Sequence, residues 1–131
     1  MKSLTIIILT FALGIGAAIA TPATAQAPRL SMEEQVAHQA MANPKQYAQQ
    51  QLKVFGFDSK QYVCLAQLWG KESGWNHKAD NPKSSAFGIA QLLGEKSKLP
   101  HIQINKGLRY IIHRYDTPCN AWRFWQKNYY Y

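Results

Sequence analysis

The chain has 131 residues, 47% of them hydrophobic, and a formal net charge of +8, which supports one domain with its own core. Its basic residues form no run of five and do not alternate with aromatic residues, which argues against a dedicated nucleic-acid-binding strip. The two cysteines and four histidines lack metal-ligand spacing, so we expect neither a metal site nor a cofactor.

Residues 1–25 have the pattern of a secretory signal peptide. Lys2 supplies a positive start, residues 4–20 are nearly continuously apolar, and the A-T-A motif at 23–25 has small residues at the cleavage positions. We expect cleavage before Gln26, no stable membrane insertion, and a secreted, periplasmic or wall-associated product. The alternative is a retained membrane anchor, although the apolar run is slightly short for a span of about 20 residues.

Residues 26–42 are an N-terminal segment that precedes the main domain, 43–131. Ser31 and Glu34 have the spacing of a capping box, which predicts a helix through residue 42. Asn43 followed by Pro44 predicts the start of a second helix, which ends at residue 56 and places Phe55 on its apolar side.

A third helix carries the most informative carboxylate. Ser59 can cap its start, and the Ser-Gly pair at 73–74 can end it. At 100° per residue, Glu72 falls on the same face as Leu68 and Trp69. Apolar neighbours, the indoles of Trp69 and Trp75, and the helix dipole would raise its pKa. This environment suits a proton donor, whereas the alternative is an ordinary solvated glutamate at a helix end.

The remaining segments predict a mostly helical protein. Residues 76–87 are rich in turn-forming residues and are expected to form a loop, and GIAQLLG at 88–94 a short apolar turn of helix. Residues 105–115 have helical spacing, and Thr117-Pro118 predicts the start of an aromatic-rich final helix. No segment alternates as a strand, so the fold class expected is all-α.

Two ordered blocks of sequence resemble a known family. They are CLAQLWGKESGWN at 64–76 and RYDTPCNAW at 114–122, with GIAQ at 88–91 between them. Together they resemble lytic transglycosylases of the lysozyme-like clan, especially small secreted actinobacterial proteins and phage wall-degrading domains. The resemblance covers about residues 43–125. It implies a small lysozyme-like helical domain with a disulfide.

The resemblance also implies an activity and a partner. A cleft between helices would bind the glycan strands of peptidoglycan, and we expect the protein to act as a monomer. The family's single catalytic acid/base matches Glu72. It would protonate the oxygen between N-acetylmuramate and N-acetylglucosamine, and the muramate 6-hydroxyl would then close a 1,6-anhydro ring.

Other family positions match with substrate-binding roles. Ser73 follows the catalytic glutamate, and Gly88 and Gln91 match a G-[LI]-x-Q block. Asn81 stands where many members have serine, so Ser84 or Ser85 could take that role instead. The intervening loop is one residue longer than the commonest spacing.

Several aromatic residues and the cysteines complete the candidate set. A late A-Y-N block is not clearly present, so Tyr115 and Trp122 are either sugar-stacking residues or core aromatics. For an exported chain, an oxidising compartment favours a disulfide between Cys64 and Cys119 over two buried thiols. The matching cysteines of the secreted relatives imply that this bridge ties the catalytic helix to the last one.

Two further functions compete with the transglycosylase. A muramidase would hydrolyse the same bond with water and use Asp80 or Asp116 as a second carboxylate, although Asp80 also suits a simple turn. An inactive wall-binding module would keep the cleft without the chemistry. Glu95, flanked by lysines, is expected to form a solvated salt bridge.

Overall fold

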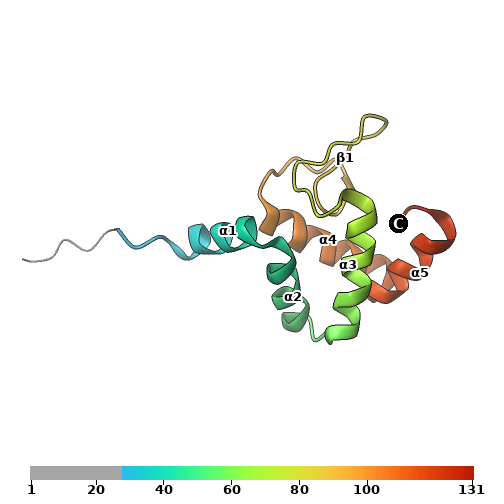
Figure 1. Ribbon diagram of the computed structural model, residues 1–131, viewed down its shortest axis with the longest axis horizontal. Coiled ribbons are helices and arrows are strands. Elements are labelled where there is room, and N and C mark those ends of the chain that lie inside the picture. The colour runs from blue at the N-terminus through green and yellow to red at the C-terminus, as the bar shows by residue number, and fades with distance from the viewer. Residues whose placement is uncertain (1–27) are drawn as a thin grey trace, which may run out of the picture.

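The computed structural model describes residues 28–131; the predicted signal peptide and its cleavage site lie outside these residues. The described part is mostly helical, which confirms a small all-α domain (Figure 1). Its elements are α1 Met32–Ala42, α2 Pro44–Val54, α3 Ser59–Ser73, β1 Ala86–Phe87, β2 Leu92–Leu93, α4 Pro100–Tyr115 and α5 Pro118–Asn128. Within residues 28–131, no helix is long and apolar enough to cross a membrane.

Side-chain caps set most of the helix starts. The Ser31–Glu34 capping box begins α1 as predicted, and Asn43 begins α2 by accepting a hydrogen bond from the backbone N–H of the third helical residue. The predicted cap of α3 is wrong by one residue. Asp58 has extended backbone and accepts from a backbone N–H, whereas Ser59 is already helical. A carboxylate at this position also interacts favourably with the helix dipole.

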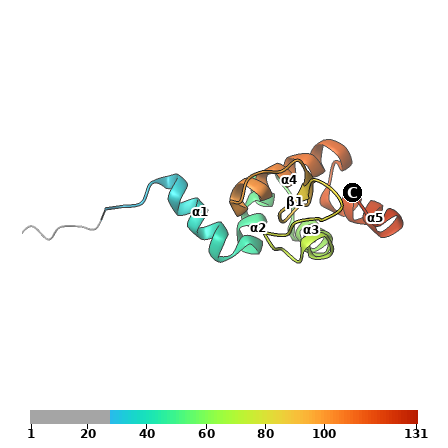
Figure 2. The same ribbon diagram turned by 90° about the horizontal axis from the view of Figure 1, so that it is seen from above.

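The core lies where α3 and α4 meet their neighbours. Leu68 and Trp69 of α3 and Leu108 of α4 have no exposed surface. α4 packs on α1, α2 and α5, and α3 packs on α2 and α5. Phe55 does not join the core as predicted: α2 ends at Val54, two residues before the predicted end, and Phe55 remains 40% exposed. Figures 1 and 2 both show α1 projecting from the group formed by the other four helices.

Two predictions for the second half of the chain are corrected. Residues 88–94 do not form a helical turn, because β1 and β2 pair antiparallel and residues 88–91 are the turn between them. Gly88 and Gln91 have φ values of 79° and 50° in this turn, which a right-handed helix cannot contain. The helix predicted at 105–115 begins earlier, with Pro100 in its first turn, a position that needs no backbone donor.

The disulfide is confirmed. The sulfur atoms of Cys64 and Cys119 are 2.08 Å apart and their Cα atoms 4.9 Å apart. The side-chain oxygen of Gln61 also accepts a hydrogen bond from the backbone N–H of Cys119 at 2.9 Å. α3 is therefore joined to the start of α5 by a covalent bond and by a hydrogen bond one turn away.

Candidate active site

Glu72 lies in the last turn of α3 and its side chain is half-buried. The helix ends directly after it, where Gly74 adopts the left-handed conformation with φ 62°. The indole nitrogen of Trp125, in α5, donates a hydrogen bond of 2.5 Å to one Glu72 carboxyl oxygen. Burial raises the pKa of Glu72, and the Trp125 hydrogen bond acts in the opposite direction without cancelling that effect. Glu72 is thus biased toward its protonated form.

The indole that contacts Glu72 is not one of those expected from its neighbours in sequence. Trp69 and Trp75 are buried and meet edge to face, with ring centroids 5.2 Å apart. Their indole N–H groups donate elsewhere, to the Tyr131 hydroxyl and to a backbone carbonyl of α3. They support α3 from inside, and α5 supplies the partner of the carboxyl group.

The Glu72 side chain lines a cavity of about 310 Å³ between α3, the hairpin and the end of the chain. Its other lining residues are Asn81, Ala86, Gln91, Leu93 and Tyr129, Tyr130 and Tyr131. Glu72 supplies the only carboxylate side chain among these residues. Asp80 and Asp116 are exposed and do not line the cavity. A carboxyl group whose pKa is raised by burial, in a cavity lined by amides and phenols, is suited to donate a proton to a bound ligand.

Tyr131 is part of the site, a role that the sequence pattern does not predict. Tyr129 adopts the left-handed conformation after α5, and the chain then returns to the core. The Tyr131 hydroxyl accepts a 2.9 Å hydrogen bond from the indole of Trp69 and donates one of 2.6 Å to the Ala90 carbonyl. Burial raises the pKa of the Tyr131 phenol well above its ordinary value. The run of three tyrosines at 129–131 was the available signal.

Ser73 ties α3 to the hairpin turn. Its hydroxyl lies 2.7 Å from the Ile89 carbonyl oxygen and 3.3 Å from the Trp69 carbonyl oxygen. A hydroxyl has one proton to donate, and the shorter contact is the better hydrogen bond. Ser73 follows Glu72 in the chain, and its hydroxyl is already hydrogen-bonded to the backbone of the hairpin turn.

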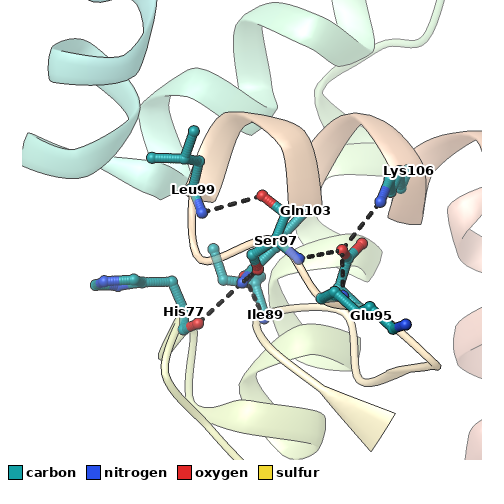
Figure 3. Close-up of polar contacts among 8 residues, drawn as sticks. His77, Ile89, Glu95, Ser97, Leu99, Gln103 and Lys106 are labelled. Atoms are coloured by element: carbon teal, nitrogen blue, oxygen red, sulfur yellow. Dashed lines mark hydrogen bonds and ion pairs between the residues drawn. The ribbon is translucent and has the colours of Figure 1, made fainter.

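Gln103 of α4 fixes the same turn from its other side, and it was also missed. Its side-chain oxygen accepts from the Ile89 backbone N–H at 2.9 Å, and its nitrogen donates to the carbonyls of His77 and Ser97 (Figure 3). The side chain is 1% exposed. The sequence pattern predicts this helix only from residue 105, so Gln103 lies outside the predicted helix.

Gly88 is required by this arrangement. A Cβ atom at position 88 would lie 2.4 Å from the Gln103 side chain, and the φ of 79° is itself unfavourable for other residues. The close approach that Gly88 permits is therefore an approach of Gln103. This contact holds the turn against α4. Gln91, at the end of the turn, then lines the cavity.

Gln91 and Asn81 lie at the cavity, whereas Ser85 does not. The Gln91 side-chain nitrogen donates to the carbonyls of Ala79 and Gly88 at 3.1 and 2.9 Å. The Asn81 side-chain oxygen accepts from a backbone N–H two residues later, in an Asx turn. Ser85 is exposed, and its hydroxyl accepts from the backbone at the far end of the hairpin.

The remaining two aromatic candidates lie outside the cavity. Tyr115 is 9% exposed and packs against Phe124 and Tyr131 with centroid distances of 5.3 and 6.1 Å. Trp122 stacks on Trp125 at 5.3 Å with planes 16° apart. Tyr115 is thus a core residue. Trp122 packs against Trp125, whose indole contacts Glu72.

Glu95 is buried, which corrects the expectation of a solvated salt bridge. One carboxylate oxygen accepts from the backbone N–H groups of Lys96 and Ser97 and lies 3.0 Å from the Lys106 ammonium (Figure 3). Burial acts to raise the pKa of Glu95, but these hydrogen bonds and the Lys106 charge outweigh it and lower the pKa. Glu95 is therefore held ionised, as a structural partner of α4.

Among residues 28–131, no group of three or more histidines, cysteines and acidic residues is placed to hold a metal ion. Comparisons of the chain with protein-family models, with curated proteins and with solved structures found no match. The chain's own residues and their geometry therefore carry the functional proposal.

Proposed function

We propose that this protein is a secreted or wall-associated peptidoglycan lytic transglycosylase that cleaves the bond between N-acetylmuramate and N-acetylglucosamine. One observation carries the proposal: Glu72, with a pKa raised by burial, is the only carboxylate side chain lining its cavity. The blocks at 64–76 and 114–122 that resemble the family support it. The basic net charge of the chain suits an anionic wall polymer.

A single carboxyl group suffices for this reaction. Protonated Glu72 gives its proton to the glycosidic oxygen as the bond to the muramate anomeric carbon breaks. The resulting carboxylate takes the proton of the muramate 6-hydroxyl, whose oxygen bonds to the same carbon. Glu72 ends protonated, and the products are an N-acetylglucosamine hydroxyl and a 1,6-anhydromuramoyl end. No water is consumed.

The position of the other acids favours this route over hydrolysis. Most glycosidases use two carboxyl groups about 5 to 9.5 Å apart across the scissile bond. Asp80 and Asp116 are exposed and outside the cavity, so neither serves as a nucleophile or as a base for water. The 6-hydroxyl belongs to the reacting sugar and has the advantage of proximity.

The groups around Glu72 suit a carbohydrate. The amides of Asn81 and Gln91 can hydrogen-bond to hydroxyl and acetamido groups, and the phenol rings of Tyr129 and Tyr130 can pack against sugar faces. The Trp125 N–H donates to one Glu72 oxygen and so orients the other toward the ligand.

The deciding experiment is mass spectrometry of the muropeptides that the purified protein releases from peptidoglycan sacculi. A lytic transglycosylase releases fragments with 1,6-anhydro ends in ordinary or ¹⁸O-labelled water. Reducing ends that carry ¹⁸O from water would establish a muramidase instead. Binding without release, under conditions in which a known lysozyme digests the same sacculi, would indicate a wall-binding module.

A further inference from the structure

A second and larger hollow, of about 500 Å³, lies beside the disulfide between the first turns of α3 and α5. Lys60, Gln61 and Cys64 line it from α3, and Cys119, Trp122 and Arg123 from α5. Gln61 and the disulfide hold these two helix starts together. The hollow is therefore formed by a covalently fixed part of the fold.

This hollow lies on the same side of α3 as the catalytic candidate. Gln61 and Glu72 are eleven residues apart in one helix. That is close to three whole turns, and the distance along the axis is about 16 Å at 1.5 Å per residue. On α5, Trp122 lines the hollow and stacks on Trp125, which contacts Glu72. The seam between α3 and α5 thus joins the two concave regions.

The side chains that line the hollow suit a carboxylate carried on a short apolar group. Lys60 and Arg123 are exposed at its wall, and no acidic side chain of residues 28–131 lines it. The half-buried Trp122 adds an aromatic surface. Arginine is suited to two parallel hydrogen bonds with a carboxylate, and lysine supplies a second positive charge.

The length of the peptide that the proposed substrate carries matches the distance between Glu72 and the hollow. In peptidoglycan, each muramate carries a stem peptide, and an uncross-linked stem ends in a free carboxylate. A stem of about four or five residues spans roughly 13 to 18 Å when it is extended. A stem on a muramate bound at Glu72 can therefore reach the hollow about 16 Å away.

We propose that the hollow beside the disulfide binds the terminal carboxylate of an uncross-linked stem peptide, and that Lys60 and Arg123 recognise it. This proposal rests on the proposed function, because that function places a muramate at Glu72. It makes the enzyme selective for strands with free stems. A stem that is cross-linked through its own terminal carboxyl has an amide there and loses the charge that both cations recognise.

The direct test is binding of two soluble ligands, a muramyl pentapeptide with a free terminal carboxylate and the same compound with a terminal amide. We expect the acid to bind about three- to tenfold more tightly than the amide to the wild-type protein, as for two partly exposed ion pairs. Isothermal titration calorimetry measures both affinities. In the Lys60→Ala/Arg123→Ala variant the ratio should fall to about one.

A matched control separates recognition from general attraction. Lys53→Ala/Arg109→Ala removes the same charge at two exposed positions that do not line the hollow, and it should keep the wild-type ratio. The proposal would be overturned if the wild-type protein did not prefer the acid to the amide, if the Lys60/Arg123 variant kept that preference, or if the control lost it. The proposal would also be overturned if neither ligand bound to the wild-type protein.

Cleavage assays extend the test and distinguish it from failure of the proposed function. On strands with free stems, kcat/KM of the Lys60/Arg123 variant should fall by about the same factor as binding, and on amidase-stripped strands it should stay unchanged. Equal losses on both substrates would contradict stem recognition. If the wild-type protein cleaves neither substrate, the proposed function fails, and the ligand affinities still decide the chemistry of the hollow.

Discussion

The indole nitrogen of Trp125 lies 2.5 Å from a carboxyl oxygen of Glu72, although 53 residues separate them in the chain. This contact makes α5 part of the candidate active site. Cys119 in the first turn of α5 is in turn bonded to Cys64 of α3, two turns before Glu72. The position of the proposed acid therefore depends on the whole junction between the two helices.

Glu72→Gln should abolish activity and leave the fold intact. Glutamine keeps the size and an oxygen for the Trp125 donor, but it has no proton to give. We expect the rate of muropeptide release to fall at least about a hundredfold, since general acid–base catalysis contributes about 10² to 10⁴. Glu33→Gln, at an exposed position of α1, is the matched control. A Glu72→Gln rate above a hundredth of wild type would show the assignment to be wrong.

The same substitution should make the protein more stable at neutral pH. Burial raises the pKa of Glu72, so the folded state disfavours its charged form. Wild-type stability is therefore lost as pH rises from the unfolded pKa through the higher folded pKa, and the glutamine variant lacks this loss. Calorimetry should give equal Tm values below about pH 4 and a higher variant Tm near pH 7. A lower variant Tm at neutral pH would contradict the direction.

Trp125→Phe should shift the pH profile of activity. The Trp125 hydrogen bond lowers the pKa of Glu72 against the effect of burial, so its removal raises that pKa further. A general acid works only when protonated, and the alkaline limb of kcat/KM should therefore move to higher pH while the maximal rate falls. Trp122→Phe keeps the hydrogen bond and is the control. A limb that moves to lower pH, or equally in both variants, would refute this role.

Removing the disulfide should destabilise the protein and its active site together. The bridge closes a loop of 55 residues, and chain entropy predicts a loss of up to about 4 kcal/mol. The free energy of unfolding of Cys64→Ser/Cys119→Ser can be measured by urea titration. Because α5 carries Trp125, the alkaline limb of activity should shift in the same direction as in Trp125→Phe. Wild-type stability in the variant would contradict the first expectation, and an unshifted alkaline limb would contradict the second.

Gln103→Leu should release the hairpin turn. The substitution removes the buried hydrogen bond of the Ile89 N–H and the part-buried bonds of the His77 and Ser97 carbonyls, and an unsatisfied buried group costs about 1 to 3 kcal/mol. We expect a loss of at least about 2 kcal/mol in the free energy of unfolding and faster hydrogen exchange of the Ile89 amide. Gln67→Leu, at an exposed position of α3, should change neither.

The starts of α1, α2 and α5 and the disulfide were predictable because their determinants are local or compositional. The capping residues Ser31, Asn43 and Thr117 each bond to a backbone N–H three residues later in the chain. Asp58 and Ser59 are adjacent and both suited to capping, which explains the error of one residue there. The face of α3 that carries Glu72 also follows from helical periodicity alone.

The turn at 88–91 could not be assigned from its own residues. A short apolar run such as GIAQLLG fits a buried helical turn as well as a strand. Two groups distant in sequence made the choice: the Ser73 hydroxyl of α3 donates to the Ile89 carbonyl, and the Gln103 side chain of α4 accepts from the Ile89 N–H. Gly88, within the turn, leaves room for that glutamine. The hydrogen-bond partners of a backbone segment decide its conformation when its own pattern does not.

The sequence by itself determined the starts of α1, α2 and α5, the cysteine pair and the glutamate on an apolar face. Only the tertiary structure decided what surrounds that glutamate. Trp125 reaches Glu72 across 53 residues, and the Tyr131 hydroxyl joins Trp69 to Ala90 across 62 and 41. Periodicity and capping report interactions within about four residues, whereas these contacts exist only once α3, α4 and α5 have packed and buried their apolar surface together.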